Sequence, residues 1–182
     1  MNALRRVAVF AVPAALYFAM RPFTDSDTVA LAIAGALPLA YQMIVVLVGR
    51  RVDAWATVSG VGFVLACVVS ALAGGSSLPL KLHEAGITFV LGLVLLVAAL
   101  IRRPIPLGRL LKAPTNDSAL GALIGAFLML HALLHLALAI TLSTSTYVVA
   151  GRLINWGTLA VGAVLLWTYL RRLRAAAAGT AS

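Results

Sequence analysis

Charged residues are scarce in this chain, and acidic residues are the scarcest of them. Only 10% of the 182 residues are charged, whereas 63% are hydrophobic, and the mean hydropathy is +1.07. A soluble domain carries roughly 25% charged residues to cover its surface, so this composition excludes a water-soluble fold. It indicates a chain solvated by lipid, which keeps its charges in the connections between apolar runs. The lipid bilayer is therefore the first partner that we expect.

The shortage of cysteine and the placement of the cations exclude further classes of protein. The single cysteine, Cys67, rules out an intramolecular disulfide and a multi-cysteine metal site, and we interpret it as a small packed hydrophobe. Fourteen basic residues against five acidic ones give a net charge of +9. The cations lie in short gaps between apolar runs instead of forming a stripe on one folded surface, so we expect no nucleic-acid partner.

Six apolar runs are candidates for membrane-spanning helices. A hydrocarbon core of about 30 Å needs about 20 helical residues. The first run is short and contains Pro13, but the sequence "YFAMRPF" lacks the small residues that a signal peptidase needs, so we expect this run to remain as a span. The expected spans are residues 7–20, 28–48, 54–73, 85–101, 118–141 and 147–170.

The distribution of charge supports all six spans. If each run crosses, the N-terminus, the second and fourth connections and the C-terminus share one side, which holds eleven cations and two acids. That side carries a net charge of +9, whereas the other, with three cations and three acids, is neutral. The positive-inside rule then predicts that both termini are cytoplasmic. The predicted fold class is all-α, a polytopic six-helix transmembrane bundle over residues 1–174, followed by a disordered cytoplasmic tail at 175–182.

Two histidines stand out because they lie deep in an apolar run. A spacing of four residues places His131 and His135 on one helix face, and counting the helical rise places them near the middle of the fifth span. Polar side chains at that depth face the bundle interior or water, and they mark a site by default. Other polar residues approach from the same outer half, which predicts an outward-facing polar pocket. The pocket candidates are His131, His135, Arg152, Asn155, Lys81, His83, Glu84, Arg21, Asp25 and Asp27.

The sequence leaves the chemistry of this pocket open. A metal site would need a third and a fourth ligand from the outer connections, and no HExxH or clustered-histidine pattern is present, so we expect neither a metal nor a cofactor. Two histidines at this spacing cannot both be axial ligands of one haem. A proton-coupled carrier could use the pair, because imidazole titrates near neutral pH. The simplest interpretation is that the pair hydrogen-bonds to a neighbouring helix and holds the bundle in register.

Small residues in the fifth span predict close helix packing. Gly121 and Gly125 have the small-xxx-small spacing that lets another helix approach. We interpret the motif as packing within the bundle, because six helices have many internal interfaces. The oligomeric state stays open.

Two segments of the chain resemble a known family. The first is "LKLHEAGITFVLGLVLLVAALIRRPIPLGRLLK", with Lys81 before the expected fourth helix and a basic-Pro turn at Arg103 and Pro104. The second is "HALLHLALAITLSTSTYVV", whose Ser-Thr-x-Thr-aromatic turn occupies residues 143–147. Both are similar to the intracellular septation protein A family and to a broader, uncharacterised group of small bacterial inner-membrane proteins. The likeness covers residues 25–174 with diffuse motifs.

The chain departs from these relatives at its histidine pair. The broader group has a glutamate at the position of His131 and an arginine at that of His135, and septation protein A has an asparagine at the second position. A polar couple is thus kept while its chemistry changes. The departure favours an architectural role for the pair over metal chemistry.

The resemblance implies a multi-pass protein of the bacterial cytoplasmic membrane with a role in the cell envelope or in division. Other envelope or division membrane proteins are its expected partners, and no catalysis is implied. We therefore expect a non-catalytic scaffold or interaction protein. The alternatives are a small proton-coupled transporter or exporter that uses the polar pocket and an intramembrane enzyme acting on a lipid or isoprenoid. No Ser-His-Asp set or phosphate-binding glycine loop supports the enzyme.

Overall fold

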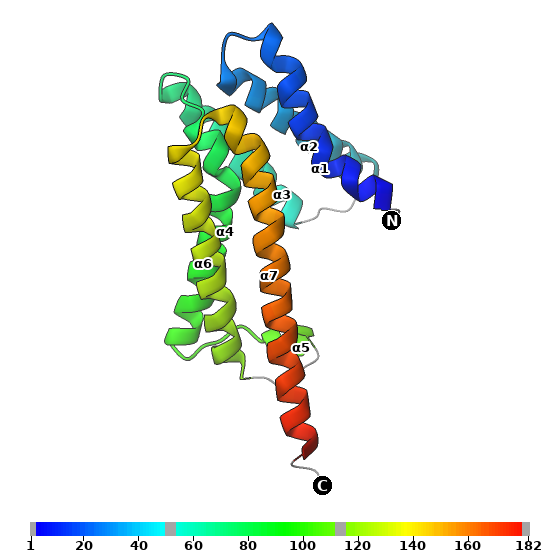
Figure 1. Ribbon diagram of the computed structural model, residues 1–182, viewed down its shortest axis with the longest axis vertical. Coiled ribbons are helices and arrows are strands. Elements are labelled where there is room, and N and C mark those ends of the chain that lie inside the picture. The colour runs from blue at the N-terminus through cyan, green and yellow to red at the C-terminus, as the bar shows by residue number, and fades with distance from the viewer. Residues whose placement is uncertain (1–2, 50–53, 112–115, 180–182) are drawn as a thin grey trace. The chain divides into compact units, whose positions relative to one another are not determined.

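Helices form almost all of the chain that the structure describes. The structure is a computed structural model, and it describes residues 3–49, 54–111 and 116–179. Within these ranges it has seven α-helices, one 3₁₀ helix and no strand, which confirms the all-α class. The helices are α1 (Ala3–Met20), η1 (Arg21–Phe23), α2 (Asp27–Gly49), α3 (Ala54–Leu72), α4 (Leu78–Leu100), α5 (Leu107–Leu111), α6 (Asp117–Thr141) and α7 (Thr144–Gly179) (Figure 1).

Three helices of the described chain are long and apolar enough to cross a membrane. They are α4, α6 and the part of α7 that ends at Ala175. Shorter apolar stretches occupy Asp27–Leu37 of α2 and Thr57–Leu72 of α3. Each of the six runs expected from hydropathy overlaps one of the long helices, α1, α2, α3, α4, α6 or α7. Six membrane crossings remain a prediction.

The side chains are distributed in the opposite way to those of a soluble protein. Leu100 and Leu153 expose 73% and 70% of their surface, whereas Ser70, His131 and Thr144 are buried. Of the thirteen buried hydrophobic residues in the described chain, seven are alanines. Small residues inside and large aliphatic residues outside are typical of helices that pack in lipid, where close approach of backbones replaces a hydrophobic core.

The chain folds as two compact units. The first comprises Met1–Ile87 and Leu136–Gly151, and the second comprises Thr88–His135 and Arg152–Ser182. Helices α4, α6 and α7 contribute residues to both units. The single domain expected over residues 1–174 stays a prediction.

In the first unit, small residues on α2 let aromatic and aliphatic side chains of its neighbours come close. Tyr17 of α1 is fully buried against Ala30 and Ala34 of α2. Phe63 of α3 packs against Leu80 of α4 in a second cluster. These contacts position the polar residues at the ends of α1, α2 and α4.

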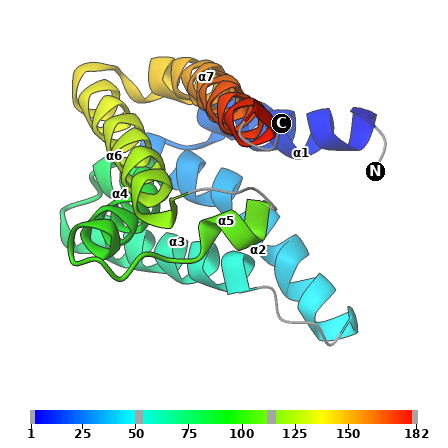
Figure 2. The ribbon, with the colours of Figure 1, turned by 90° about the horizontal axis from the view of Figure 1, so that it is seen from below.

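In the second unit, α4 and α6 pack backbone to backbone. They lie side by side in both ribbon views (Figures 1 and 2). A Cβ atom added at Gly125 would lie 2.7 Å from the carbonyl oxygen of Gly92, and one added at Gly92 would lie 2.8 Å from that of Gly125. The two backbones approach this closely only because neither residue has a side chain. Near the end of α4, the Ser118 hydroxyl donates a hydrogen bond of 2.9 Å to the carbonyl of Ala99.

Helix α4 ends in a Schellman motif with an unusual residue. Arg103 N donates to Ala98 O at 3.0 Å, and Arg102 N donates to Ala99 O at 3.3 Å. This motif places its second-last residue in the left-handed region, where glycine is usual. Here that residue is Arg102, with φ 56°, which is the one non-glycine residue of the described chain with a positive φ. A left-handed conformation costs an L-residue roughly 1–2 kcal/mol.

Helix α4 begins earlier than the hydropathy predicts. It starts at Leu78, so Lys81, His83 and Glu84 lie in its first turns and not in the connection before it. The polar side chains of this first turn lower the local hydropathy, which hides the helix start from a search for apolar runs.

Helix α7 is longer than its apolar run in both directions. It begins at Thr144, where the Ser143 hydroxyl accepts a hydrogen bond from Thr146 N, and it continues to Gly179. The segment 175–179 was expected to belong to a disordered tail, but it consists of four alanines, the best helix formers, and a glycine.

The basic connection before α6 also differs from expectation, because it contains the short helix α5. Three of the cations predicted on the cytoplasmic side, Arg50, Arg51 and Lys112, lie outside the described residues.

Candidate functional site

The two histidines of α6 are buried side by side. His131 and His135 are 7% and 8% exposed, and their ring centroids lie 4.7 Å apart with 58° between the ring planes. Residues four apart on a helix lie one above the other, which explains this contact. The pair belongs to the second unit.

A hydrogen bond joins this pair to α7. His131 Nδ1 lies 2.7 Å from the hydroxyl oxygen of Thr158. That hydroxyl also lies 2.8 Å from Ile154 O and 3.1 Å from Asn155 O. The single hydroxyl proton of Thr158 can be donated to one of these carbonyls or to His131, so either Thr158 or His131 is the donor of the bond between them.

Asn155 lies on the same part of α7. Its side chain is a second hydrogen-bonding neighbour of His131. Asn155 and Thr158 are three residues apart, so α7 presents both polar groups to α6 on one face. The arrangement is a part-buried polar bridge between two apolar helices.

In the first unit, Lys81 caps the C-terminal end of α6. Its Nζ donates to Ala139 O at 3.3 Å and to Leu142 O at 3.1 Å, and it lies 5.7 Å from the centre of the Tyr147 ring. The Tyr147 hydroxyl in turn donates to Lys81 O at 2.8 Å. The last carbonyls of a helix and the face of an aromatic ring both attract an ammonium group. Lys81 thus joins α4, α6 and α7.

Asp27, the first residue of α2, is bound by α1 and the turn that follows it. The Tyr17 hydroxyl donates to Asp27 Oδ1 at 3.1 Å, and Arg21 forms an ion pair with the same oxygen. Lys81 is also within electrostatic range of this carboxylate. Asp25 is exposed and forms no ion pair with another described residue. The contacts of Tyr17 and Arg21 with Asp27 hold the end of α1 and the turn after it against the start of α2.

The remaining pocket candidates make local contacts. His83 Nδ1 donates to Leu80 O at 2.8 Å, its Nε2 lies 3.9 Å from a Glu84 oxygen, and its ring meets the Phe63 ring edge-on at 5.5 Å. Arg152 is half-buried and forms no ion pair within the described ranges. The contacts of His83 hold its side chain in place at the start of α4.

The ten residues predicted to line one pocket are thus divided between the two units. The first unit holds Arg21, Asp25, Asp27, Lys81, His83 and Glu84, and the second holds His131, His135, Arg152 and Asn155. A pocket formed by all ten stays a prediction. Among the described residues, no three His, Cys, Asp or Glu side chains lie close enough to hold a metal ion together.

Sequence analysis missed three residues that complete these groups. Thr158, Tyr17 and Tyr147 are uncharged and lie in segments that read as apolar. For Thr158, the one available sequence signal is its spacing of three residues from Asn155. This spacing places both side chains on one face of α7, as the four-residue spacing does for the two histidines of α6.

The helix-packing glycines predicted on α6 lie along α4. Gly125 faces Gly92 at the distances given above, and a Cβ added at Gly121 would lie 3.6 Å from Leu95 O and 3.8 Å from the Ala99 Cβ. Of the two glycines predicted on α6, only Gly125 therefore requires the absence of a side chain.

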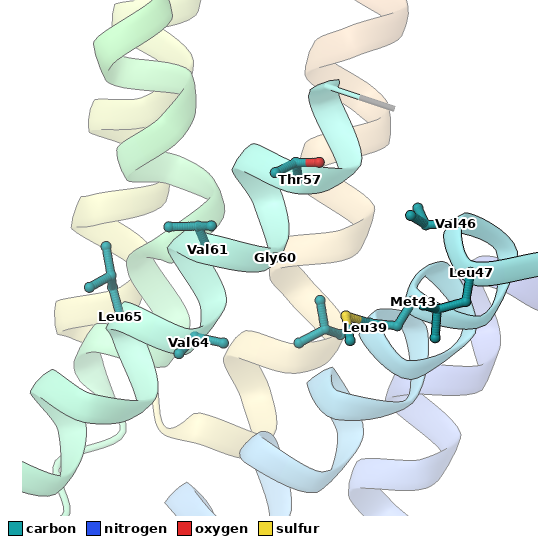
Figure 3. Close-up of a pocket in the computed structure, with 9 residues that line it drawn as sticks. All are labelled: Leu39, Met43, Val46, Leu47, Thr57, Gly60, Val61, Val64 and Leu65. Carbon is teal, nitrogen blue, oxygen red and sulfur yellow. The ribbon is translucent and has the colours of Figure 1, made fainter. Parts of the chain in front are cut away.

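An apolar groove with a volume of about 440 Å³ lies between α2 and α3 (Figure 3). Both helices supply side chains to it, and Thr57 is the polar residue of its lining. The lining residues are Leu39, Met43, Val46, Leu47, Thr57, Gly60, Val61, Val64 and Leu65. No titratable group lines it, so the groove can hold an apolar chain but offers no general acid or base.

Comparison with known proteins gives no match for this chain among protein-family models, curated proteins or solved structures. The resemblance to the septation protein A family stays a prediction.

Proposed function

We propose that this chain is a non-catalytic scaffold or interaction protein of the bacterial cytoplasmic membrane, of the septation protein A type. One observation carries the proposal: two buried or half-buried polar side chains, those of Lys81 and His131, bind neighbouring helices. Lys81 caps α6, and His131 binds Thr158 of α7. Side chains engaged in this way hold a bundle in register, which is what a scaffold needs.

The proposed topology has six membrane crossings with both termini in the cytoplasm. Helix α7 supports it, because Arg152 and Arg171 bracket residues 153–170, which carry no charge. These eighteen residues span about 27 Å, close to the thickness of the hydrocarbon core. The net charge of +9 on the proposed cytoplasmic side supports the same orientation.

Reporter fusions test this topology. Fusions of alkaline phosphatase, which is active only outside the cytoplasm, and of green fluorescent protein, which folds inside it, would be placed after Gly75, Arg103, Ser143 and Ser182. We expect phosphatase activity after Gly75 and Ser143 and fluorescence after Arg103 and Ser182. Phosphatase activity at the C-terminal fusion would overturn the orientation.

Purification from native membranes tests the scaffold role. The tagged chain would be isolated with its lipids retained, beside a tagged membrane protein of similar size as a control. We expect envelope or division proteins to co-purify with this chain and not with the control, and the same set to co-purify with the His131→Ala variant. A result in which the chain and the control capture the same proteins would count against the proposal.

A small proton-coupled transporter is the second candidate, and the histidine pair is the observation that favours it. The adjacent rings of His131 and His135 form a buried, titratable couple in an apolar helix. Liposomes with an entrapped pH-sensitive dye measure the proton flux directly. A carrier requires a flux that exceeds that of protein-free liposomes and is lost in His131→Ala. Equal flux in all three preparations would exclude it.

A further inference from the structure

The contacts of the second unit determine which residues of α6 and α7 lie at the same level. His131 meets Thr158, and a Cβ atom added at Gly162 would lie 2.5 Å from the ring of Phe127. Phe127 lies four residues before His131 on α6, and Gly162 lies four residues after Thr158 on α7. The two helices are therefore antiparallel with a constant register over this stretch.

The same register can be followed to the end of the unit. Ser118 lies nine residues before Phe127 on α6, which is about 14 Å along the helix. Arg171 lies nine residues after Gly162 on α7, so Ser118 and Arg171 are at the same level. Ser118 is bonded to Ala99 in the last turn of α4. Arg171 thus lies level with the end of α4, and Arg102 follows that end after Ile101. Two segments about seventy residues apart in the chain are brought to one level.

Five exposed arginines gather at this level, which we call the basic end. They are Arg102, Arg103, Arg171, Arg172 and Arg174. Figure 1 shows α7 continuing past the turn in which α4 ends. Asp117 is the acidic residue of this unit, and its carboxylate accepts a hydrogen bond from Gly108 N. Within the described chain, no ion pair neutralises these arginines.

Two features show that the basic end is more than a signal for membrane orientation. Arg102 occupies the left-handed position of the Schellman motif, φ 56°, where glycine would be relaxed. An orientation signal needs only positive charge near the helix end, and it would be served equally by a cation one residue further on. A strained residue is expected where its side chain has a function.

The second feature is an aromatic residue one turn before the arginines. Trp167 is 60% exposed, and the guanidinium of Arg171 lies 5.5 Å from its ring centre. Tryptophan is enriched at the level of lipid headgroups, so this pair indicates where the membrane surface crosses α7. With the membrane surface placed there, we expect the arginines beyond Trp167 to lie at the level of the lipid phosphates.

We propose that the basic end binds the phosphate groups of anionic phospholipids at the membrane surface. A guanidinium group fits phosphate because it donates two parallel hydrogen bonds and stays charged. Clusters of four or more basic residues directly beyond a transmembrane helix bind anionic lipids in this way. The proposal rests on the membrane placement of the chain but on neither its scaffold role nor its orientation.

The test measures lipid binding to the purified full chain in neutral detergent micelles, where orientation in a membrane has no influence. Phosphatidylglycerol and phosphatidylcholine would be titrated separately, with retained lipid counted by native mass spectrometry. We expect phosphatidylglycerol to bind and phosphatidylcholine to bind far more weakly. Each arginine removed is expected to weaken phosphatidylglycerol binding about fivefold, so the triple variant Arg171→Gln, Arg172→Gln, Arg174→Gln should lose about a hundredfold.

The variant Arg102→Gly keeps the test decisive if the triple variant folds poorly. It should weaken phosphatidylglycerol binding about fivefold while raising the melting temperature, because glycine relieves the left-handed strain. Arg152→Gln, at the other end of the apolar part of α7, is the matched control and should bind phosphatidylglycerol like the unchanged chain.

Three outcomes would overturn the proposal. They are unchanged phosphatidylglycerol binding in Arg102→Gly and the triple variant, an equal loss in Arg152→Gln, and displacement of the lipid by millimolar inorganic phosphate, which would indicate a site for the free anion. Failure of the scaffold experiment would leave this result unaffected, since no protein partner takes part in it.

Discussion

His131 Nδ1 of α6 and the hydroxyl of Thr158 of α7 share a hydrogen bond of 2.7 Å, so each polar group has its partner on the neighbouring helix. Helices in lipid gain little from burying apolar surface against each other, because lipid is equally apolar. Their arrangement depends on close packing of small residues and on polar bridges such as this one. The bridge therefore determines the register of α6 against α7.

Removal of this bridge is expected to destabilise the chain. His131→Ala and Thr158→Val should each lower the free energy of unfolding by about 0.5–2 kcal/mol, the range for hydrogen bonds between transmembrane helices. Thermal unfolding in detergent measures the change. Thr168→Val is the matched control, because the Thr168 hydroxyl bonds only to the carbonyl of Leu165 in its own helix at 2.9 Å.

The double variant separates the bridge from general effects of the substitutions. If His131 and Thr158 act through one hydrogen bond, the combined loss is smaller than the sum of the two single losses. Fully additive losses, or an equal loss in Thr168→Val, would contradict the assignment.

Two glycines of α6 are expected to respond differently to the same substitution. In Gly125→Ala the new methyl group meets the Gly92 carbonyl at 2.7 Å and the Leu96 nitrogen at 2.9 Å, both backbone atoms that cannot move aside. The helices must separate, and the free energy of unfolding should fall by about 1–3 kcal/mol. In Gly121→Ala the nearest atoms lie at ordinary contact distance, 3.6 Å and beyond.

Gly121→Ala should consequently be neutral or slightly stabilising, because alanine favours the helix by up to about 1 kcal/mol over glycine. Urea or thermal unfolding of both variants in the same detergent gives the comparison. An equal effect of the two substitutions would show that α4 does not approach α6 at Gly125 as the structure has it.

The helices of this chain could be predicted from sequence because each apolar run overlaps one of the long helices. The ends could not, and α4 shows why. Its first two turns contain Lys81, His83 and Glu84, and a hydropathy search assigns such residues to a connection. Lys81 is tolerated in the helix because the carbonyls of Ala139 and Leu142 accept hydrogen bonds from its ammonium group. That compensation comes from another helix, and no local pattern reveals it.

The candidate site was predictable to a similar degree. The four-residue spacing places His131 and His135 together, since this depends only on helix geometry. Their partner on α7 depends on the register between two helices, which hydropathy leaves undetermined. Thr158 is one of many threonines in the chain, and only the packed structure distinguishes it.

The hydroxyl of Tyr147 is expected to stabilise the junction of α4 and α7. Tyr147→Phe removes the bond of 2.8 Å to Lys81 O and leaves the ring for the ammonium group. The free energy of unfolding should fall by about 0.5–1.5 kcal/mol, the net value of a typical hydrogen bond. Tyr169→Phe, further along α7, is the control and should leave thermal unfolding unchanged. Equal melting of the Tyr147→Phe variant and the unchanged chain would contradict this role.

Lys81 is expected to hold the turn between α6 and α7 together. Lys81→Met keeps the aliphatic part of the side chain but removes the charge that binds Ala139 O and Leu142 O. The last carbonyls of α6 then lose their donor, so the backbone around residues 139–146 should open more often. Hydrogen–deuterium exchange of that segment should become faster, by about tenfold if the cap contributes about 1.4 kcal/mol. The control variant Arg152→Met removes a cation of α7 that forms no ion pair in the described chain, and it should leave the exchange of residues 139–146 unchanged. Faster exchange in both variants would assign the effect to lost charge in general, and unchanged exchange in Lys81→Met would show that other contacts hold the turn.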